Sequence, residues 1–430
     1  MKNILIITSV LLWCVTIVSA QQIPAPAQSK PILITGGTAH LGNGKIIENS
    51  IIGFENGKLT IVGDATAVLP DGSKNWEQID ASGKDIYPGL IAPNSQIGLI
   101  EIGAVRATRD ADEVGSLNPN LRSIIAYNTD SDVTPTVRSN GILIAQVVPQ
   151  GGFISGTSSI VELDGWNWED AAYKMDDGIH LNWPSMMTWT GWQEGNPRRI
   201  KNKKYNEQVT EMQQFIAEAK AYCESGNREE TNLKLAAMCN LFTKKGKLFI
   251  HVNDAEGITT AIPLKAEFGM DIVIVGGRDS YRVAALLAKE KIPVILYQTQ
   301  SMPYRNDDDI DQPFKTPKML QDAGVLYAIG GEGYWQQRNL PFQAGQAVGF
   351  GLSKELAIQA ITKNPAMILG IDETVGTLET GKDATLIISS GDVLDMRTSS
   401  IEQAFIRGKA IDLDDKQKEL YRKFKEKYNR

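Results

Sequence analysis

The strongest constraint on the fold is a long alternation of short apolar runs with helical patterns, which fills residues 86–370. The clearest strand-like runs are 142–148, 248–252, 271–275, 292–297 and 325–329, and the clearest helical patterns are 208–223, 260–268, 281–289 and 354–363. Strands that alternate with helices indicate parallel strands joined by crossover helices. The number of units and their total length predict an α/β fold with a (β/α)8 TIM-type barrel.

Strand-and-turn patterns flank this segment on both sides. Residues 31–84 contain short strand-like runs around Asn56-Gly57, a dipeptide favoured in two-residue hairpins. Similar runs follow Gly370, and the chain then ends in a charged amphipathic helix. We therefore predict a small β-sandwich domain built from residues 21–85 and 373–412, a barrel over 86–372 and a C-terminal helix over 413–430.

The N-terminus has the pattern of a secretory signal. Lys2 precedes an apolar run over residues 4–18, and Val18-Ser19-Ala20 supplies small residues before a cleavage point. The run is shorter than the ~20 apolar residues that a membrane span needs. We expect a cleaved signal peptide over residues 1–20, an exported, periplasmic protein and no membrane span.

The remaining cysteines, Cys223 and Cys239, lie in helix-like sequence. An oxidising compartment would permit a disulfide between them, but spacing alone does not distinguish a bridge from two buried thiols.

Composition narrows the class of partner. The formal net charge is -7 and basic residues are interleaved with acidic ones, so the sequence offers no concentrated basic face for nucleic acid. A hydrophobic content of 42% is ordinary for a folded domain. These features favour a small-molecule substrate or ligand.

The junctions between the two patterns carry a family resemblance. The segment Tyr87-Pro88-Gly89-Leu90-Ile91 resembles the entry to the first barrel strand of the amidohydrolase superfamily. The return to the small domain resembles the same superfamily through Asn364-Pro365-Ala366, Leu369-Gly370, Val375-Gly376-Thr377-Leu378 and Gly381-Lys382-Asp383-Ala384. Residues 151–156 and 251–268 are similar to the imidazolonepropionase-like branch of that superfamily.

The resemblance implies a hydrolase mechanism. One or two divalent metals at the C-terminal mouth of the barrel activate water for attack on an amide or related C–N bond. The family's ligands are a His-x-His pair after strand one, single histidines after strands five and six, and an aspartate after strand eight. Members with two metals add a bridging carboxylate or a modified lysine after strand four.

At the matching positions this chain carries mostly other residues. The strand-one pair falls on Asn94 and Gln96, and carboxamides replace imidazole poorly at a zinc-type site. His251 occupies the strand-five position, Gly276 the strand-six position and Glu332 the strand-eight position. The resemblance thus implies His251 and Glu332 as catalytic residues and as the ligands of one weakly bound divalent metal, or of none. It also implies that Asn94 and Gln96 contact substrate, at a metal site that has lost most of its ligands.

Two further features near the expected mouth need interpretation. Arg106 and Arg109 follow strand one, and a guanidinium can hold a substrate carboxylate bidentately, although a solvated polar loop explains the same residues. His180 follows a loop-like acidic pair, Asp176-Asp177, and no strand-four lysine can be identified.

Two functions remain open at this stage. One is an exported hydrolase of non-peptide C–N bonds, in an amide or a cyclic amide. The other is a non-catalytic binding or partner subunit that kept the barrel without its metal, associated with a related amidohydrolase-like subunit or as a homo-oligomer. A third hypothesis is a solute-binding protein that captures a small anion through Arg106 or Arg109.

Overall fold

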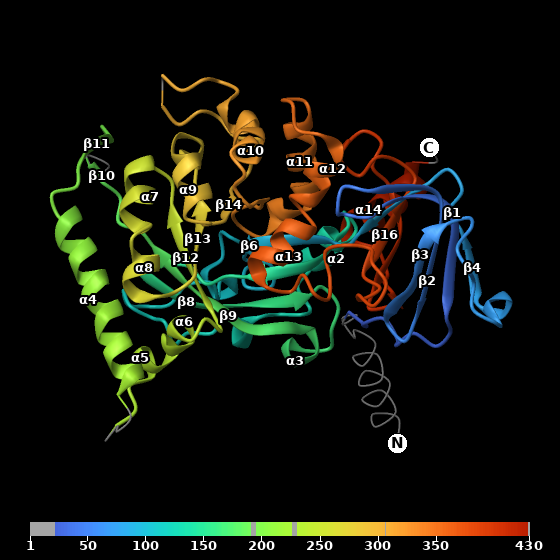
Figure 1. Cartoon of the computed structure of the whole chain (residues 1–430), viewed down its shortest axis with the longest axis horizontal. Helices are drawn as coiled ribbons and strands as arrows, with labels where there is room; N and C mark the ends of the chain where they lie inside the picture. The colour runs from blue at the N-terminus through green and yellow to red at the C-terminus, as the bar shows by residue number, and fades with distance from the viewer. Residues whose placement is uncertain (1–21, 191–194, 226–229, 306, 429–430) are drawn as a thin grey trace, which may run out of the picture.

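The computed structural model describes residues 22–190, 195–225, 230–305 and 307–428. A barrel-like sheet with its helices forms the left and centre of Figure 1, and a smaller sheet packs beside it on the right. The predicted signal peptide lies outside the described residues. Among the helices that are described, none is long and apolar enough to cross a bilayer.

Eight strands form the barrel-like sheet, and most of them are buried along their whole length. In spatial order they are β6 (Leu90–Ser95), β7 (Ile142–Val147), β8 (Ile154–Glu162), β9 (Ala172–Asn182), β12 (Lys247–Val252), β13 (Ile272–Gly276), β14 (Val294–Leu296) and β15 (Tyr327–Ile329). Between β15 and β6 the barrel closes through single contacts. The carbonyls of Ala360 and Ile361 accept hydrogen bonds from the amides of Ile329 and Ile91, both at 2.9 Å.

One strand departs from the predicted all-parallel barrel. β8 pairs antiparallel with both β7 and β9, whereas the other neighbouring pairs of this sheet are parallel. Only residues 148–153 separate β7 from β8. A parallel crossover needs about a dozen residues or more, so a connection this short forces the chain to turn back. β7, β8 and β9 therefore form a meander within the barrel.

Helices connect and cover the parallel strands. They are α2 (Val133–Arg138), α3 (Trp168–Ala171), α4 (Tyr205–Glu224), α5 (Leu233–Ala237), α6 (Cys239–Phe242), α7 (Ala255–Ala261), α8 (Leu264–Phe268), α9 (Ala284–Lys289), α10 (Gln312–Asp322), α11 (Leu340–Val348), α12 (Lys354–Gln359) and α13 (Lys363–Leu369). The helix expected over 260–268 is divided into α7 and α8 around Pro263, which lacks the amide hydrogen that helix continuation requires. A disulfide joins Cys223 of α4 to Cys239 of α6.

The small sheet combines both ends of the chain. Its strands are β1 (Ile32–His40), β2 (Ile46–Glu55), β3 (Lys58–Asp64), β4 (Glu77–Asp80), β5 (Asp85–Pro88), β16 (Leu386–Ser389), β17 (Ile401–Ile406) and β18 (Lys409–Ala410). They form one continuous hydrogen-bonded sheet, rather than the two separate sheets of the expected sandwich. Asn56 and Gly57 turn β2 into β3 with φ values of 52° and 77°, as the hairpin pattern predicts. The chain ends in α14 (Lys416–Tyr428), whose side chains are exposed.

The barrel interior is apolar at its centre and polar at one end. Ile91, Ile144, Phe249, Val273 and Ile295 are fully buried in one cluster with residues of α13. We call the end at which β12, β13, β14 and β15 finish the mouth, and the opposite end the base. In a barrel of this kind the mouth is where functional side chains gather.

Candidate active site

A hydrogen-bonded series of four side chains runs from the barrel interior to the mouth. His180 of β9 contacts His251 of β12 through Nδ1 and Nε2, 2.8 Å apart. The other ring nitrogen of His251, Nδ1, lies 3.1 Å from the hydroxyl of Tyr297, which directly follows β14. That hydroxyl also hydrogen-bonds the carboxyl of Glu332, in the loop after β15. Parallel neighbouring strands bring these residues together, although they are far apart in sequence.

The interior members of this series are uncharged. Burial lowers the pKa of His251 to about 4, and burial together with the His251 ring lowers the pKa of His180 well below its ordinary value. Burial raises the pKa of Tyr297, as does the neighbouring Glu332 carboxylate. At neutral pH the two imidazoles are therefore neutral, and Tyr297 keeps its proton and can donate a hydrogen bond.

Glu332 is the member of the series that reaches solvent. It lines a cavity of about 270 Å³ at the mouth, whose wall includes Gly276, Arg278, Tyr297 and Tyr304. Partial burial raises the pKa of the Glu332 carboxyl, and the hydrogen bond from Tyr297 opposes that shift. A carboxyl group with a raised pKa beside a cavity can exchange a proton with a bound molecule.

Asn94 and Gln96 lie at the end of β6, where the sequence places them, but neither lines this cavity. Asn94 adopts a left-handed conformation, with φ of 56°, and its Nδ2 donates to the carbonyl of Gly331 at 3.2 Å. Both residues are buried, and Asn94 Oδ1 and Gln96 Oε1 accept no hydrogen bond within the described part of the chain. Their substrate-binding role stays a prediction.

A second buried polar cluster adjoins Asn94. Gln146 of β7 accepts a hydrogen bond from the Asn94 amide at 3.1 Å and donates to Asp177 at 2.8 Å. Ser158 of β8 donates to the same carboxylate at 2.7 Å. Burial raises the pKa of Asp177 to about 6, although the bonds from Ser158 and Gln146 lower it. Asp176-Asp177 thus belongs to strand β9, so the interpretation of this pair as a loop was wrong.

The structure does not bring the two predicted arginines to the cavity. Arg106 is exposed on the short helix Arg106–Thr108, and Arg109 is exposed with Asp112 at 3.9 Å. The arginine that lines the cavity is Arg278, two residues after Gly276. Because Gly276 was predicted at the end of a strand, Arg278 two residues later could have been predicted near the mouth. Tyr297 was missed in the same way, at the end of the run 292–297.

The residues at the mouth do not fit a divalent metal held by His251 and Glu332. Both ring nitrogens of His251 are engaged in hydrogen bonds, and Tyr297 lies between that ring and Glu332. A Cβ at Gly276 would lie 2.7 Å from Asn253 Oδ1, so no ligand side chain fits there without rearrangement. The described residues contain no group of three His, Cys, Asp or Glu side chains placed to share a metal, whereas catalytic zinc takes about three protein ligands. β9, the fourth strand, carries His180 near its mouth end rather than a lysine.

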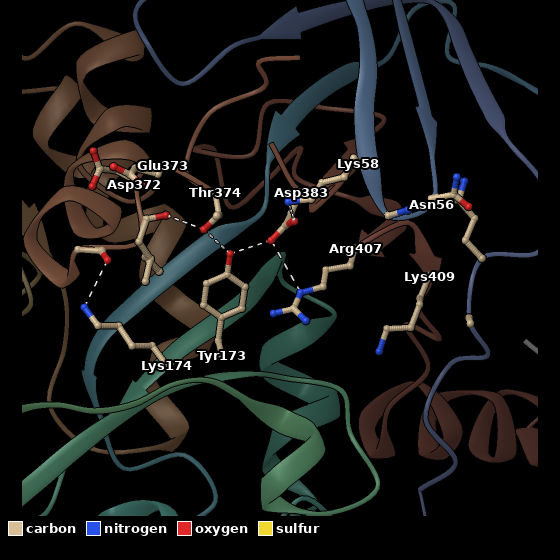
Figure 2. A pocket seen from close by; sticks show the side chains of 15 residues that line it. Asn56, Lys58, Tyr173, Lys174, Asp372, Glu373, Thr374, Asp383, Arg407 and Lys409 are labelled. Atoms are coloured by element: carbon tan, nitrogen blue, oxygen red, sulfur yellow. Dashed lines mark hydrogen bonds and ion pairs between the residues drawn. The ribbon is translucent and has the colours of Figure 1, made fainter. Parts of the chain in front are cut away.

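A larger cavity of about 990 Å³ lies at the base, between the start of β9 and the small sheet. Figure 2 shows Tyr173 at its centre, with its hydroxyl 2.7 Å from Asp383. Lys58 pairs with Asp383 at 2.6 Å, and Arg407 pairs with Glu162 at 2.7 Å and lies over the Tyr173 ring. These charges neutralise one another across the seam of the two sheets, so we assign this cavity a structural role.

Comparisons with known proteins agree with the resemblance. The model of a family described as Amidohydrolase family matches residues 314–411. Imidazolonepropionase of Clostridium tetani (strain Massachusetts / E88) is 22% identical over an alignment of 400 residues, and the match covers 81% of this chain and 86% of that protein. Amidohydrolase tasK of Hapsidospora irregularis is 29% identical over 165 residues, but the match spans 29% of this chain and only 16% of tasK.

A solved structure is similar over nearly the whole length. The crystal structure of an amidohydrolase from Thermotoga maritima MSB8 has a TM-score of 0.76 and 24% identity, and the match covers 89% of this chain and 99% of that one. The strand-end positions, the order of the junction motifs and these comparisons agree. The family model and the imidazolonepropionase match support a place in the imidazolonepropionase-like branch of the amidohydrolase superfamily, and the solved structure shows the same fold.

Proposed function

We propose that the chain is a hydrolase that cleaves a non-peptide C–N bond, in an amide or a cyclic amide, of a small molecule bound at the mouth, with Glu332 rather than a resident metal as the acid–base group. The observation that carries this proposal is the series His180, His251, Tyr297 and Glu332, which ends at a carboxyl in a small-molecule cavity. The size of the cavity is close to the lower limit of about 300 Å³ for ligand sites.

Glu332 would act first as a base and then as an acid. Its carboxylate accepts a proton from a water molecule as the water oxygen forms a bond to the substrate carbonyl carbon. The C–N bond then breaks, and the proton passes from Glu332 to the leaving nitrogen. The products are a carboxylic acid and an amine, or one ring-opened molecule, and Glu332 returns to its starting state. The raised pKa of Glu332 suits both steps because it brings the group closer to neutral pH.

Tyr297 and the histidines are positioning residues in this proposal. The Tyr297 hydroxyl donates its single hydrogen to Glu332, so His251 Nδ1 carries a hydrogen and donates to the Tyr297 oxygen. Because His251 is itself held by the fully buried ring of His180, the orientation of Tyr297 depends on both histidines. None of the three changes its charge in the cycle.

The test combines turnover with a substitution and a metal assay. The purified protein is assayed against N-acyl amino acids, cyclic imides and imidazolones, before and after dialysis against EDTA, with its metal content measured by mass spectrometry. We expect turnover that survives chelation and falls about 100-fold or more in Glu332→Gln, the range for loss of a general acid–base group. Retained folding of Glu332→Gln is checked by circular dichroism and thermal melting.

Three outcomes would contradict the proposal. Activity that disappears on chelation and returns with zinc would require a metal centre formed by other side chains. Activity unchanged in Glu332→Gln would remove the assigned base. A protein that binds members of the panel but turns over none of them would support the non-catalytic binding subunit, which the comparisons do not favour.

We also propose that the protein is exported to the periplasm. The N-terminal pattern over residues 1–20 supports export, and the disulfide between Cys223 and Cys239 suits an oxidising compartment. Expression of the full chain in a bacterial host, followed by N-terminal sequencing of the periplasmic fraction, should give a chain that begins near Gln21. A full-length chain confined to the cytoplasm would refute export.

A further inference from the structure

The charged residues around the mouth cavity are unevenly paired. Arg278, Asp279, Asp308 and Glu332 line the cavity. Arg305 holds Asp279 through two hydrogen bonds of 3.0 Å and holds Asp308 at 2.9 Å. Arg282 also lies 3.6 Å from Asp308, so two arginines that do not line the cavity balance the charges of the two aspartates.

Arg278 has no comparable partner. Its closest carboxylate contact is Nε to Asp279 Oδ1 at 4.0 Å, longer than a hydrogen bond, and that carboxylate is already bonded by Arg305. Within the described residues its buried Nε makes no hydrogen bond. A buried guanidinium nitrogen without an acceptor is costly, so its retention at the wall of a cavity points to an acceptor supplied by a ligand.

The guanidinium is also held in place. Its central carbon lies 3.7 Å from the centroid of the Tyr304 ring, and Arg199 of β11 (Arg198–Lys201) lies 4.7 Å from the same centroid. β11 pairs with β10 (Met187–Thr190) in a hairpin beside the mouth. Stacking on an aromatic face fixes the plane of the guanidinium while its N–H groups stay available at the edge. The arrangement is thus preorganised for a planar group with two oxygens.

We propose that Arg278, stacked on Tyr304, forms a carboxylate-binding subsite of the mouth cavity, so that the substrate is an acid whose scissile C–N bond lies beside Glu332. This inference rests on the proposed function. A guanidinium forms paired hydrogen bonds with a carboxylate, and Arg278 and Glu332 share one cavity wall.

Binding is measured by isothermal titration calorimetry with Glu332→Gln, in which the proposed chemistry is disabled. The probes are N-acetyl amino acids and hydantoin-5-acetic acid, each paired with its own primary amide, and inorganic phosphate. We expect the best acid to bind about 10- to 100-fold more tightly than its amide, as charge-assisted bidentate bonds imply. The preference should weaken as ionic strength rises.

Substitutions then locate the subsite. Arg278→Gln in the Glu332→Gln background should lower the affinity for the acid to that for its amide, and Arg278→Lys should keep part of the preference. Arg397→Gln serves as the charge-matched control, because Arg397 is 84% exposed and pairs with Asp395 away from the mouth. Its acid preference should equal that of the parent.

Three results would overturn the subsite. The first is equal affinity for acids and their amides, including no binding by either. The second is an acid preference that is lost in Arg106→Gln or Arg109→Gln but kept in Arg278→Gln. The third is tighter binding of phosphate than of every acid. These results are separable from failure of the proposed function. An Arg278-dependent acid preference without turnover would leave the subsite and refute hydrolysis, whereas turnover of acids and amides at equal kcat/KM would do the reverse.

Discussion

The hydrogen bond between Tyr297 and Glu332 links a group that cannot ionise at neutral pH to one that can. Burial raises the pKa of both side chains, but only Glu332 has an ordinary pKa low enough to lose its proton under working conditions. Tyr297 therefore acts on the carboxylate as a fixed donor, and this contact should control how readily Glu332 is deprotonated.

Replacing Tyr297 by phenylalanine tests that contact. The hydrogen bond lowers the pKa of Glu332, so its loss should raise that pKa and move the acidic limb of the pH profile of kcat/KM to higher pH. The plateau should fall about 10-fold, as expected for a lost hydrogen bond of ~1.4 kcal/mol. A lower plateau with an unmoved limb would mean that Tyr297 serves only to pack the site.

Individual site residues differed in how far the sequence revealed them. His251 lies at the end of β12 and Glu332 follows β15, at positions that the superfamily uses, so the sequence predicted both as site residues. Tyr297 and Arg278 also follow strands, but aromatic residues and arginines are common near strand ends. Only the folded structure shows that these two side chains line the same cavity. The His180–His251 contact joins two strands whose adjacency the sequence did not establish.

At the scale of single elements, the end of β6 shows how backbone shape limits the chemistry of the mouth. Asn94 has a left-handed conformation, which asparagine tolerates better than most side chains with a Cβ. Gly276, at the end of β13, has φ of 90° and is crowded by Asn253. Two of the superfamily's histidine positions therefore occupy backbone that disfavours a histidine.

This geometry predicts that Asn94→His with Gln96→His will recover metal uptake only in part. Both ring nitrogens of His251 already make hydrogen bonds. The histidine that the superfamily carries after strand six would still be absent. Metal analysis after equilibration with zinc should give clearly less than one equivalent per chain, with the unsubstituted protein as control. Stoichiometric, chelator-resistant zinc in the double variant would refute this account.

The disulfide gives a second prediction for an element. Cys223 and Cys239 are 16 residues apart, so their bridge closes a short loop between α4 and α6. Cys223→Ser with Cys239→Ser should lower the free energy of unfolding by about 3 kcal/mol on the chain-entropy estimate. Urea denaturation of the variant should match that of the reduced native protein, and reductant should not change the variant. Equal stability of the oxidised native protein and the variant would count against the bridge.

Strands and helices were predicted correctly where the local pattern of apolar residues determines them. They were missed where the length of a connection determines the direction of a strand. The strands over 248–252 and 271–275 were predicted within a residue or two because their apolar runs are uninterrupted. The strand β8 and its reversal were missed because Ser155, Thr157 and Ser158 interrupt the apolar run that marks the neighbouring strands. The six residues before it were the available signal, since they are too few for a crossover.

For the whole molecule, His40 links the small sheet to helix α12 of the barrel. It ends β1, and its Nδ1 lies 2.7 Å from Glu355 of α12, while its Nε2 lies 3.5 Å from Asp85. Burial disfavours the charged ring, but the hydrogen bonds that His40 donates to Asp85 and Glu355 outweigh it, with the charges of these carboxylates, and raise the pKa of His40 to about 9. The sequence placed this histidine in the small domain without indicating its partner across the seam.

Because folding raises the pKa of His40, the stability that this residue contributes decreases as pH rises. The contribution of His40 is fully present below its unfolded pKa of about 6.5 and is lost as pH rises through about 9. His40→Gln should therefore lower the free energy of unfolding by on the order of 2 kcal/mol at pH 6 and by much less at pH 10. Urea titrations at both values check this, and a penalty independent of pH would refute the ionic link.

The sequence predicted a barrel beside a small domain, but it did not predict how the first and last strands of the barrel are joined. Junction motifs placed the barrel between two halves of a small domain, whereas the contacts that close β15 onto β6 through Ala360 and Ile361 leave no trace in the pattern of apolar residues. The pattern of apolar residues indicates which segments are buried, but it does not indicate which buried segments contact one another.

The antiparallel position of β8 also bears on how the chain assembles. β7, β8 and β9 pair with partners adjacent in sequence and need no intervening long helix, so their loop-closure entropy is small. Contacts between distant segments, such as β15 with the start of the barrel, form only after much longer loops have closed. We therefore expect the meander to form early in folding, and the cavity that Glu332 lines to be completed late, because its wall includes residues after β13, β14 and β15.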